Sequence, residues 1–281
     1  MSKRNSQAAK TAARERLRAE RERQAKKDKV RRQVIVGVSI VGVLAVAGGV
    51  GWAVMQASKP SAWEAAKTAK VVAPANTSGK NGTTVVIGED SAKKTLELYE
   101  DPRCPICATF EQGVGKTIEK DVEDGKYKVK FVGASFLDGD SLDEGKIGNR
   151  GEGSKNALSA LGAALNVSPE AFLQFKSALY SAEHHPEESD DKFKDDSALI
   201  EIANDVPELK GNAKFEKAVE DGTYDRWALE MSETFQKSGV QGTPTLKMDG
   251  KKLEAKFPDG QKGTPMTAEQ FTKTIDAALK G

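Results

Sequence analysis

The arrangement of apolar and polar side chains predicts three β-strands between residues 83 and 131. β-Branched residues fill 83–87, and apolar residues alternate with charged ones at 96–98 and 127–131. Between the last two stretches, residues 104–122 have helical spacing. A strand, a helix and a strand in succession predict a βαβ unit, and with it an α/β fold.

Helical spacing dominates from about 142 to 238, where we expect about four helices. After that block, alternation returns around Leu246 and leads into Asp249-Gly250, a strong signal for a two-residue hairpin turn. A final helix is predicted after Thr267, the first residue of a capping box. The strands on both sides of the helical block are therefore expected to form one mixed sheet with a helical insertion.

A different pattern occupies 34–55, where 22 consecutive residues carry no charge. As a helix this run measures roughly 33 Å, enough to cross the hydrocarbon core of a bilayer. Arg31 and Arg32 precede it, and Trp52 lies near its far end, as in interfacial anchors. A buried core helix is usually shorter, and a cleaved signal peptide has a shorter apolar region and a small-residue cleavage site. We therefore predict an uncleaved transmembrane signal anchor.

Charge is distributed unevenly on the two sides of this apolar run. The whole chain carries 43 Lys/Arg and 42 Asp/Glu, but residues 1–32 hold 13 basic and 4 acidic residues, a net of +9, and the rest nets −8. The positive-inside rule places the basic tail, 1–33, in the cytoplasm and the body outside, beyond the lipid bilayer. Residues 56–82, rich in Ala, Ser, Lys and Gly, are predicted to be a flexible stalk. The net negative charge of the body, 83–281, argues against nucleic-acid binding.

Both cysteines of the chain lie in one motif, Cys104-Pro105-Ile106-Cys107, after a predicted strand and at the start of a predicted helix. The unpaired N–H groups and the dipole at a helix N-terminus stabilise a thiolate, and Cys104 is placed to benefit most. Cys107, one turn further along, is expected to be less exposed and able to attack a mixed disulfide formed at Cys104. This spacing predicts a redox-active pair.

Two structural interpretations of the same cysteines are weaker. A disulfide between residues three apart closes a very small loop and constrains the unfolded chain little. A zinc site would need two further ligands, and the histidines of the chain are the adjacent His184 and His185 in an acidic segment, which we interpret as solvated loop residues. We expect no metal site.

A second element, Gly242-Thr243-Pro244-Thr245, immediately precedes the predicted strand around Leu246. With YEDPRCPICATFE and VQGTPTLKMDGKKL, it makes residues 83–281 resemble the DsbA-like thiol–disulfide oxidoreductases of the thioredoxin superfamily, in a membrane-anchored bacterial form. The resemblance implies a thioredoxin fold with a helical insertion. It also implies that Cys104 attacks, that Cys107 resolves, and that a cis-proline loop at Thr243 and Pro244 binds substrate backbone.

The sequence departs from that family at two places. Thioredoxins carry a buried acid six residues before the first cysteine, and here that position is Leu98; neither Glu97 nor Glu100 is clearly placed beneath the disulfide by strand alternation. The best-known DsbA has Pro-His between its cysteines, where this chain has Pro105 and Ile106. Without the histidine charge we expect a less acidic Cys104 and a somewhat less oxidising pair.

The resemblance implies an enzyme that needs no cofactor. As an oxidase it would donate the Cys104–Cys107 disulfide to exported proteins that carry cysteine thiols. A quinone-linked membrane protein, DsbB-like or vitamin K epoxide reductase-like, would reoxidise it. The direction of electron flow depends on a few kcal/mol of thiolate stabilisation, so a reductase or isomerase stays open. A non-catalytic binding module on the same fold also stays open.

Overall fold

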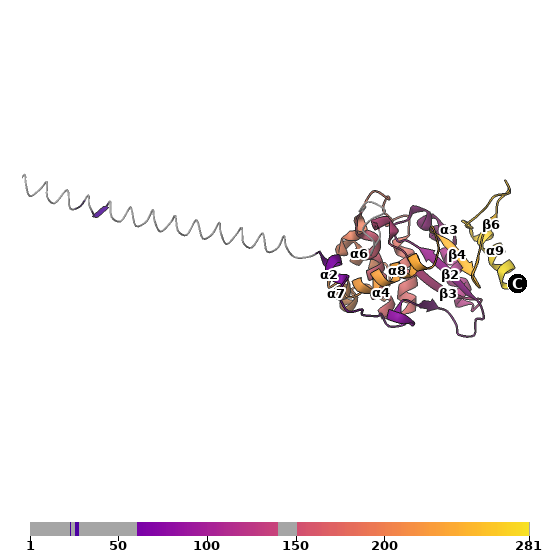
Figure 1. Cartoon of the computed structure of the whole chain (residues 1–281), viewed down its shortest axis with the longest axis horizontal. Coiled ribbons are helices and arrows are strands. Elements are labelled where there is room, and N and C mark those ends of the chain that lie inside the picture. Colours follow the sequence, from indigo (N-terminus) through magenta and orange to yellow (C-terminus); the bar gives the residue numbers. More distant parts are fainter. Residues whose placement is uncertain (1–22, 24–25, 28–60, 140–150, 281) are drawn as a thin grey trace, which may run out of the picture. The chain divides into compact units, whose positions relative to one another are not determined.

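The computed structural model describes residues 23, 26–27, 61–139 and 151–280 (Figure 1). The chain divides into two compact units, Met1–Pro60 and Ser61–Gly281, and almost all described residues belong to the second. The predicted membrane anchor, 34–55, lies outside the described residues. Within the described ranges, no helix combines the length and the apolar character needed to cross a membrane.

A five-stranded sheet forms the centre of the second unit, in the order β1-β3-β2-β4-β5. Its strands are β1 (Val85–Ile87), β2 (Thr95–Glu100), β3 (Lys128–Gly133), β4 (Thr245–Met248) and β5 (Lys251–Lys252). β2 and β3 are parallel and are joined by helix α3 (Pro105–Glu123), which confirms the predicted βαβ unit. β1 and β4 run antiparallel to their neighbours, so the sheet is mixed.

The register of the sheet follows from the apolar alternation. Leu98 lies opposite Phe131 on β3 and Leu246 on β4, and all three side chains are buried. Asp249, in the left-handed conformation, and Gly250 form the tight turn between β4 and β5. A separate short pair, β6 (Ala255–Lys256) and β7 (Lys262–Gly263), precedes the last helix, α9 (Ala268–Lys280).

Between β3 and β4 the described chain contains five α-helices, one more than the periodicity predicted. They are α4 (Gly153–Val167), α5 (Pro169–Leu179), α6 (Asp196–Ala203), α7 (Ala213–Glu220) and α8 (Asp225–Lys237). The short helices α6 and α7 have only eight residues each, too few for a clear repeat. In Figure 1 helices α4, α6, α7 and α8 lie to the left of strands β2, β3 and β4. Phe235 of α8 packs edge-to-face on Tyr99 of β2, which fixes the insertion against the sheet.

The structure differs from the predicted flexible stalk, because residues 61–82 pack on the domain. Ser61 caps the short helix α2 (Ala62–Ala66), whose Trp63 is buried. The Trp227 indole donates a hydrogen bond to the Gly82 carbonyl at 2.8 Å. Composition indicated a linker, but Trp63 and Ala66 are three residues apart and so form one buried face of a helix. The folded domain therefore begins near Ser61.

Replacing Asn76 with alanine tests this packing. Asn76 has a φ of +61° and donates from its side-chain amide to the Leu165 carbonyl at 3.0 Å. Alanine loses the hydrogen bond and is strained at positive φ, so we expect the free energy of unfolding to fall by about 1–2 kcal/mol. Asn76→Gly tolerates the backbone conformation and should lose less. Urea unfolding of both variants provides the measurement. A wild-type free energy of unfolding in both would mean that the packing of residues 61–82 does not stabilise the domain.

Candidate active site

The two cysteines lie at the start of α3. Cys104 is the N-cap residue, with Pro105 in the first turn, and it is 6% exposed. Cys107 is fully buried, as the helical position predicted. Between them Ile106 is 57% exposed, a large apolar side chain on the surface beside the reactive sulfur. Of the two cysteines, only Cys104 therefore keeps some solvent exposure.

The loop before β4 lies against Cys104. Thr243 and Pro244 are joined by a cis peptide bond, and the Cys104 thiol donates to the Thr243 carbonyl with the sulfur 3.7 Å from the oxygen. The structure thus brings Cys104 and Cys107 together with Thr243 and Pro244. Cys104 and Pro244 are 140 positions apart in the chain. β2 and β4 are neighbours in the sheet, and this pairing places the loop beside the start of α3.

The environment separates the acidities of the two thiols. A hydrogen bond from the Cys107 side chain, helped by one from the Thr243 side chain and by backbone N–H groups of α3, lowers the pKa of Cys104 to about 6, although burial opposes the shift. Burial, together with the hydrogen bond to Cys104, raises the pKa of Cys107 well above its usual value. Near neutral pH the reduced protein therefore carries a thiolate at Cys104 and a protonated thiol at Cys107.

Three buried charges lie beneath the active-site helix. Lys176 of α5 donates to Glu100 at the end of β2, 3.1 Å away, and to Glu111 of α3, 2.6 Å away. All three side chains are at most 5% exposed. Burial raises the pKa of Glu100 to about 7, even though the Lys176 charge opposes the shift. The Glu100 carboxyl, which gains and loses its proton near pH 7, thus interacts electrostatically with both cysteines.

The sequence did not predict this cluster of Glu100, Glu111 and Lys176. Leu98 occupies the position of the thioredoxin acid and points into the core, while Glu100 supplies a carboxyl two residues later. Lys176 follows Phe172 by one helical turn, on the apolar face of α5. A lysine at that spacing was the available signal for a buried ion pair, because charged residues are rarely buried unless they are paired.

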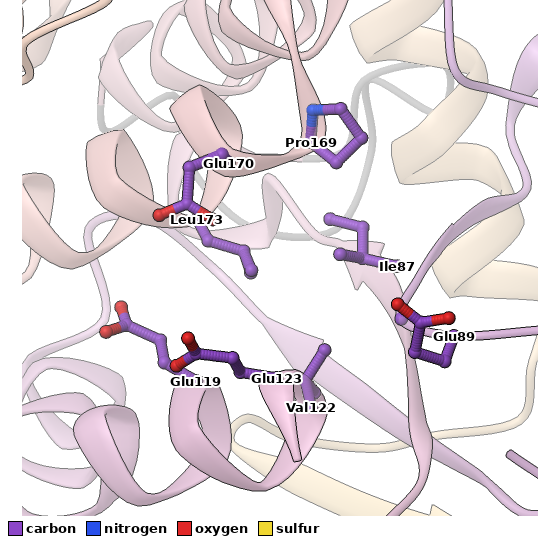
Figure 2. A pocket seen from close by; sticks show the side chains of 9 residues that line it. Ile87, Glu89, Glu119, Val122, Glu123, Pro169, Glu170 and Leu173 are labelled. Carbon is purple, nitrogen blue, oxygen red and sulfur yellow. The ribbon is translucent and has the colours of Figure 1, made fainter. Parts of the chain in front are cut away.

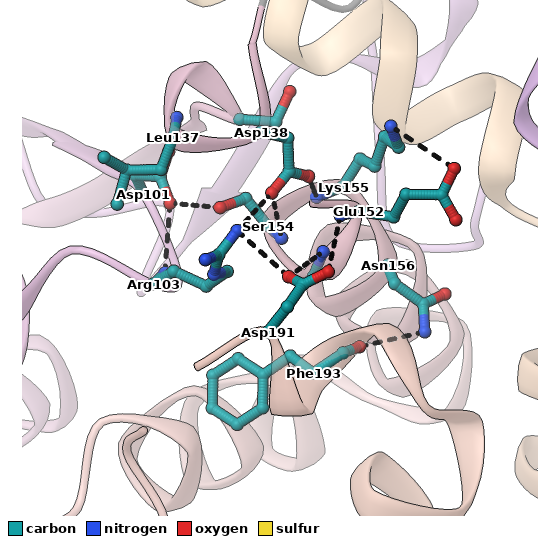
Figure 3. Close-up of polar contacts among 12 residues, drawn as sticks. Asp101, Arg103, Leu137, Asp138, Glu152, Ser154, Lys155, Asn156, Asp191 and Phe193 are labelled. Carbon is teal, nitrogen blue, oxygen red and sulfur yellow. Dashed lines mark hydrogen bonds and ion pairs between the residues drawn. The ribbon is translucent and has the colours of Figure 1, made fainter. Parts of the chain in front are cut away.

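A second buried network holds the residue before Cys104. Figure 3 shows the Arg103 guanidinium between Asp138 and Asp191, with distances of 2.8 and 3.0 Å. Asp138 also accepts hydrogen bonds from the backbone N–H groups of Ser154 and Lys155 in the first turn of α4. Since Asp138 and Arg103 are almost fully buried, this network fixes the active-site loop to the helical insertion.

The histidines are not the solvated pair that the sequence suggested. His185 stacks on the Tyr180 ring at 5.9 Å, and Tyr180 packs in the same cluster as both cysteines. Burial lowers the pKa of His185. His184 contacts the carboxylate of Asp205 at 2.6 Å. Among the described residues, no group of three or more His, Cys, Asp or Glu side chains could hold a metal ion.

A hollow of about 490 Å³ lies elsewhere in the domain, between α3, α5 and the end of β1. Figure 2 shows its side chains, with four carboxylates around an apolar floor. The acids are Glu89, Glu119, Glu123 and Glu170. Burial raises the pKa of Glu119. None of the four residues predicted for the active site lines this hollow.

The lowered pKa of Cys104 leads to a pH prediction. For the reduced protein, we expect the rate of alkylation of Cys104 by iodoacetamide to reach half its maximum near pH 6, since the thiolate is the nucleophile. Cys107 should stay unmodified. Mass spectrometry of the digested protein distinguishes the two sites. In Cys107→Ser the midpoint should change, because the strongest thiolate-stabilising contact is altered. A wild-type midpoint at pH 8 or above would contradict the geometry.

Comparisons with known proteins agree with this arrangement. A thioredoxin family model matches residues 80–277. Disulfide bond formation protein D of Bacillus subtilis is 25% identical over 197 residues, covering 70% of this chain and 77% of that protein. The crystal structure of oxidised DsbA from Mycobacterium tuberculosis is 26% identical, with a TM-score of 0.51 over 61% of this chain and 85% of that one.

The serine/threonine-protein kinase PknE of Mycobacterium tuberculosis is also 25% identical, over 161 residues. The match covers 57% of this chain but only 27% of the kinase, so it extends over about a quarter of that relative. The family model covers well over half of the chain, and the fold and the relatives agree with it. The chain belongs to the thioredoxin family and is a DsbA-like thiol–disulfide oxidoreductase.

Proposed function

We propose that the protein is a membrane-anchored extracytoplasmic oxidase that donates a Cys104–Cys107 disulfide to exported proteins with cysteine thiols. The observation that carries the proposal is the pKa of Cys104, lowered to about 6 at the start of α3. Stabilising this thiolate stabilises the reduced form, and a stabilised reduced form makes the disulfide a stronger oxidant. The most oxidising members of the superfamily reach a thiol pKa of about 3.5, so a milder oxidant is expected here.

In the proposed reaction a substrate thiolate attacks Sγ of Cys104. The Cys104–Cys107 bond breaks, a mixed disulfide forms, and Cys107 leaves with the electron pair and takes up a proton because its pKa is raised. A second substrate thiolate then attacks the substrate sulfur, and Cys104 leaves as a stable thiolate. The substrate gains a disulfide, and two electrons pass to the protein.

Glu100 supports the first step. Its carboxyl has a pKa near 7 and lies close enough to both cysteines to affect their charges. We propose that it exchanges the proton that Cys107 gains or loses. Cys104 and Thr243 face the substrate, and Pro244 shapes the loop beside them.

Anchoring and location are part of the proposal. The uncharged run 34–55 and the basic residues before it support a single span with the folded domain outside the cytoplasm. An oxidising compartment suits an enzyme that works as a disulfide. The reduced enzyme then needs an electron acceptor in the membrane, and by resemblance we propose a quinone-linked protein of the DsbB-like or vitamin K epoxide reductase-like kind.

The reduction potential of the Cys104–Cys107 couple tests the direction of electron flow. Equilibration of the full-length protein with glutathione buffers should give a value between about −120 and −180 mV, the range of oxidases and isomerases. The oxidised full-length chain should then also oxidise a reduced dithiol protein, a substrate that has no mispaired disulfide for an isomerase to act on. A potential near −270 mV would overturn the oxidase proposal and favour a reductase.

The location is tested separately with a membrane-impermeant thiol reagent. On intact cells of a bacterial host, the reduced full-length chain should be labelled at Cys104. The matched control is a variant with a cysteine in the basic tail, Ser6→Cys, combined with Cys104→Ser; its new thiol should be labelled only after lysis. Labelling of the tail cysteine in intact cells, or of Cys104 only after lysis, would contradict the proposed orientation.

A further inference from the structure

A shallow groove of about 430 Å³ lies along the loop that contacts Cys104. It is lined by residues 239–245 and by the side chains of Lys247 on β4 and Lys252 on β5. Thr243 connects the groove with the chemistry, because its carbonyl lies 3.7 Å from Sγ of Cys104. We expect a polypeptide whose cysteine reaches Cys104 to extend onto these residues.

The charge of this groove is opposite to that of the domain that contains it. Outside the basic tail the chain nets −8, and the hollow in Figure 2 is lined by four carboxylates. Among the described residues that line the groove beside Cys104, the charged ones are Lys247 and Lys252. The positive charge is thus local to a groove whose wall includes Thr243, the residue that contacts the reactive sulfur.

The two lysines are also direct cross-strand neighbours. Lys247 pairs with Lys252 in the antiparallel register of β4 and β5. Like charges placed opposite each other destabilise a sheet. Lys252 contacts Glu254 at 2.9 Å, whereas the Lys247 ammonium lies over the Tyr99 ring, 5.1 Å from its centre. Glu97 of β2 lies opposite Lys247 on its other side, but its carboxylate already accepts from the Tyr99 hydroxyl and contacts Lys130. A carboxylate in the groove would therefore still relieve the repulsion between the two lysines.

Thr243 also connects the groove to the cysteines through its side chain, which interacts with both thiols and favours their thiolate forms. A substrate segment in the groove therefore lies next to the residue that contacts the attacking sulfur.

We propose that this groove selects substrate segments that carry an Asp or Glu within a few residues of the reactive cysteine, with Lys247 and Lys252 as the specificity-determining residues. The inference rests on the proposed function, since it concerns the substrate of the same Cys104 site. An extended chain advances about 3.3 Å per residue, so a carboxylate one to three residues from the cysteine is within reach of a groove of this size. The exposed Ile106, two residues after Cys104, offers a substrate an apolar contact.

The experiment uses the oxidised full-length protein in detergent and three dithiol peptides that differ in one residue beside the first cysteine, Glu, Gln or Lys. The rate of peptide oxidation is measured by mass spectrometry and divided by the rate of the same peptide with oxidised glutathione, which corrects for thiol acidity. At low salt the Glu peptide should react about 3- to 10-fold faster than the Gln peptide, and the Lys peptide should be slowest. The preference should weaken at high salt.

The variant Lys247→Gln/Lys252→Gln should react with all three peptides at equal corrected rates, and Lys247→Glu/Lys252→Glu should prefer the Lys peptide. The matched control is Lys251→Glu, which makes the same charge change at an exposed residue of β5 that faces Met248 and does not line the groove. It should keep the wild-type preference. The reduction potential should be unchanged in the glutamine variant, which separates selectivity from a change in redox chemistry.

The outcomes are distinguishable. Equal corrected rates for the three peptides with the wild-type protein would overturn the selectivity and leave the oxidase function intact. A wild-type preference that persists in the glutamine variant, or is lost in Lys251→Glu, would show that the two lysines do not determine it. Failure of the oxidised protein to oxidise any peptide would overturn both the selectivity and the proposed function.

Discussion

Replacing Cys104 with serine is expected to lower the rate of disulfide transfer by about 1000-fold or more, the loss typical of removing a nucleophile. A serine hydroxyl does not form the sulfur–sulfur bond on which the reaction depends, and Cys107 cannot take over, because it is fully buried and its pKa is raised. Oxidative folding of a reduced dithiol substrate, with the full-length protein as oxidant, provides the measurement.

Cys107→Ser is the matched control for that result. It leaves the accessible sulfur in place but removes the group that competes with the substrate for the mixed disulfide. Substrate covalently attached to Cys104 should therefore accumulate on a non-reducing gel, whereas Cys104→Ser should give no such adduct. Adducts in Cys104→Ser, or wild-type transfer rates in either variant, would show that the assignment of attacking and resolving cysteine is wrong.

The central part of the fold could be predicted because it depends on local signals. Alternation at β2 and β3 and the helical spacing of α3 gave the βαβ unit, and Ser168 caps α5 through a hydrogen bond from the Ala171 amide, as in a standard N-cap. The motif at Cys104 lies at the start of α3 because strand, turn and helix follow one another in the chain. The proximity of Cys104 to Thr243 rested on resemblance, since no local pattern connects residues 139 positions apart.

The features that could not be predicted depend on distant partners. Residues 61–82 have a linker-like composition, and only the contact of Trp227 with Gly82 and the burial of Trp63 show that they are folded. Glu100 and Lys176 are 76 residues apart, so neither residue alone indicates a buried pair. Strand alternation was uninformative at Glu100 because three successive residues, 98–100, are buried at the end of β2.

The buried charges also connect the helical insertion with the chemistry. Lys176 belongs to α5, yet its two carboxylate partners belong to β2 and α3, the elements that flank the active-site motif. Arg103 makes a similar connection to the start of α4 through Asp138. The insertion therefore takes part in the electrostatics of the site: it supplies the Lys176 ammonium that neutralises two acids beside the cysteines, and the Asp191 carboxylate that pairs with Arg103.

Lys176→Met is expected to lower the free energy of unfolding by about 3–5 kcal/mol at pH 8, because it leaves two buried carboxyls without a counter-charge. The pKa of Glu100 is already raised by burial to about 7 in the folded protein, above the value of 4.5 expected for the unfolded chain, and it should rise further in the variant. A carboxyl with a raised folded pKa binds more protons when folded, so its contribution to stability falls as pH increases from about 4.5 through the folded pKa. The deficit of the variant should therefore be largest at pH 8 and smaller at pH 5.

Chemical unfolding at both pH values, with two comparison variants, separates this effect from a general loss of a lysine. Lys217→Met removes an exposed lysine of α7 that pairs with Asp221, and it should unfold like the wild type at either pH. Lys176→Met/Glu111→Gln removes one of the two stranded carboxylates and should recover part of the stability lost in the single variant, with a weaker dependence on pH. A loss in Lys176→Met that is equal at pH 5 and pH 8, or no larger than that of Lys217→Met, would mean that Lys176 does not neutralise the acids beneath the active-site helix.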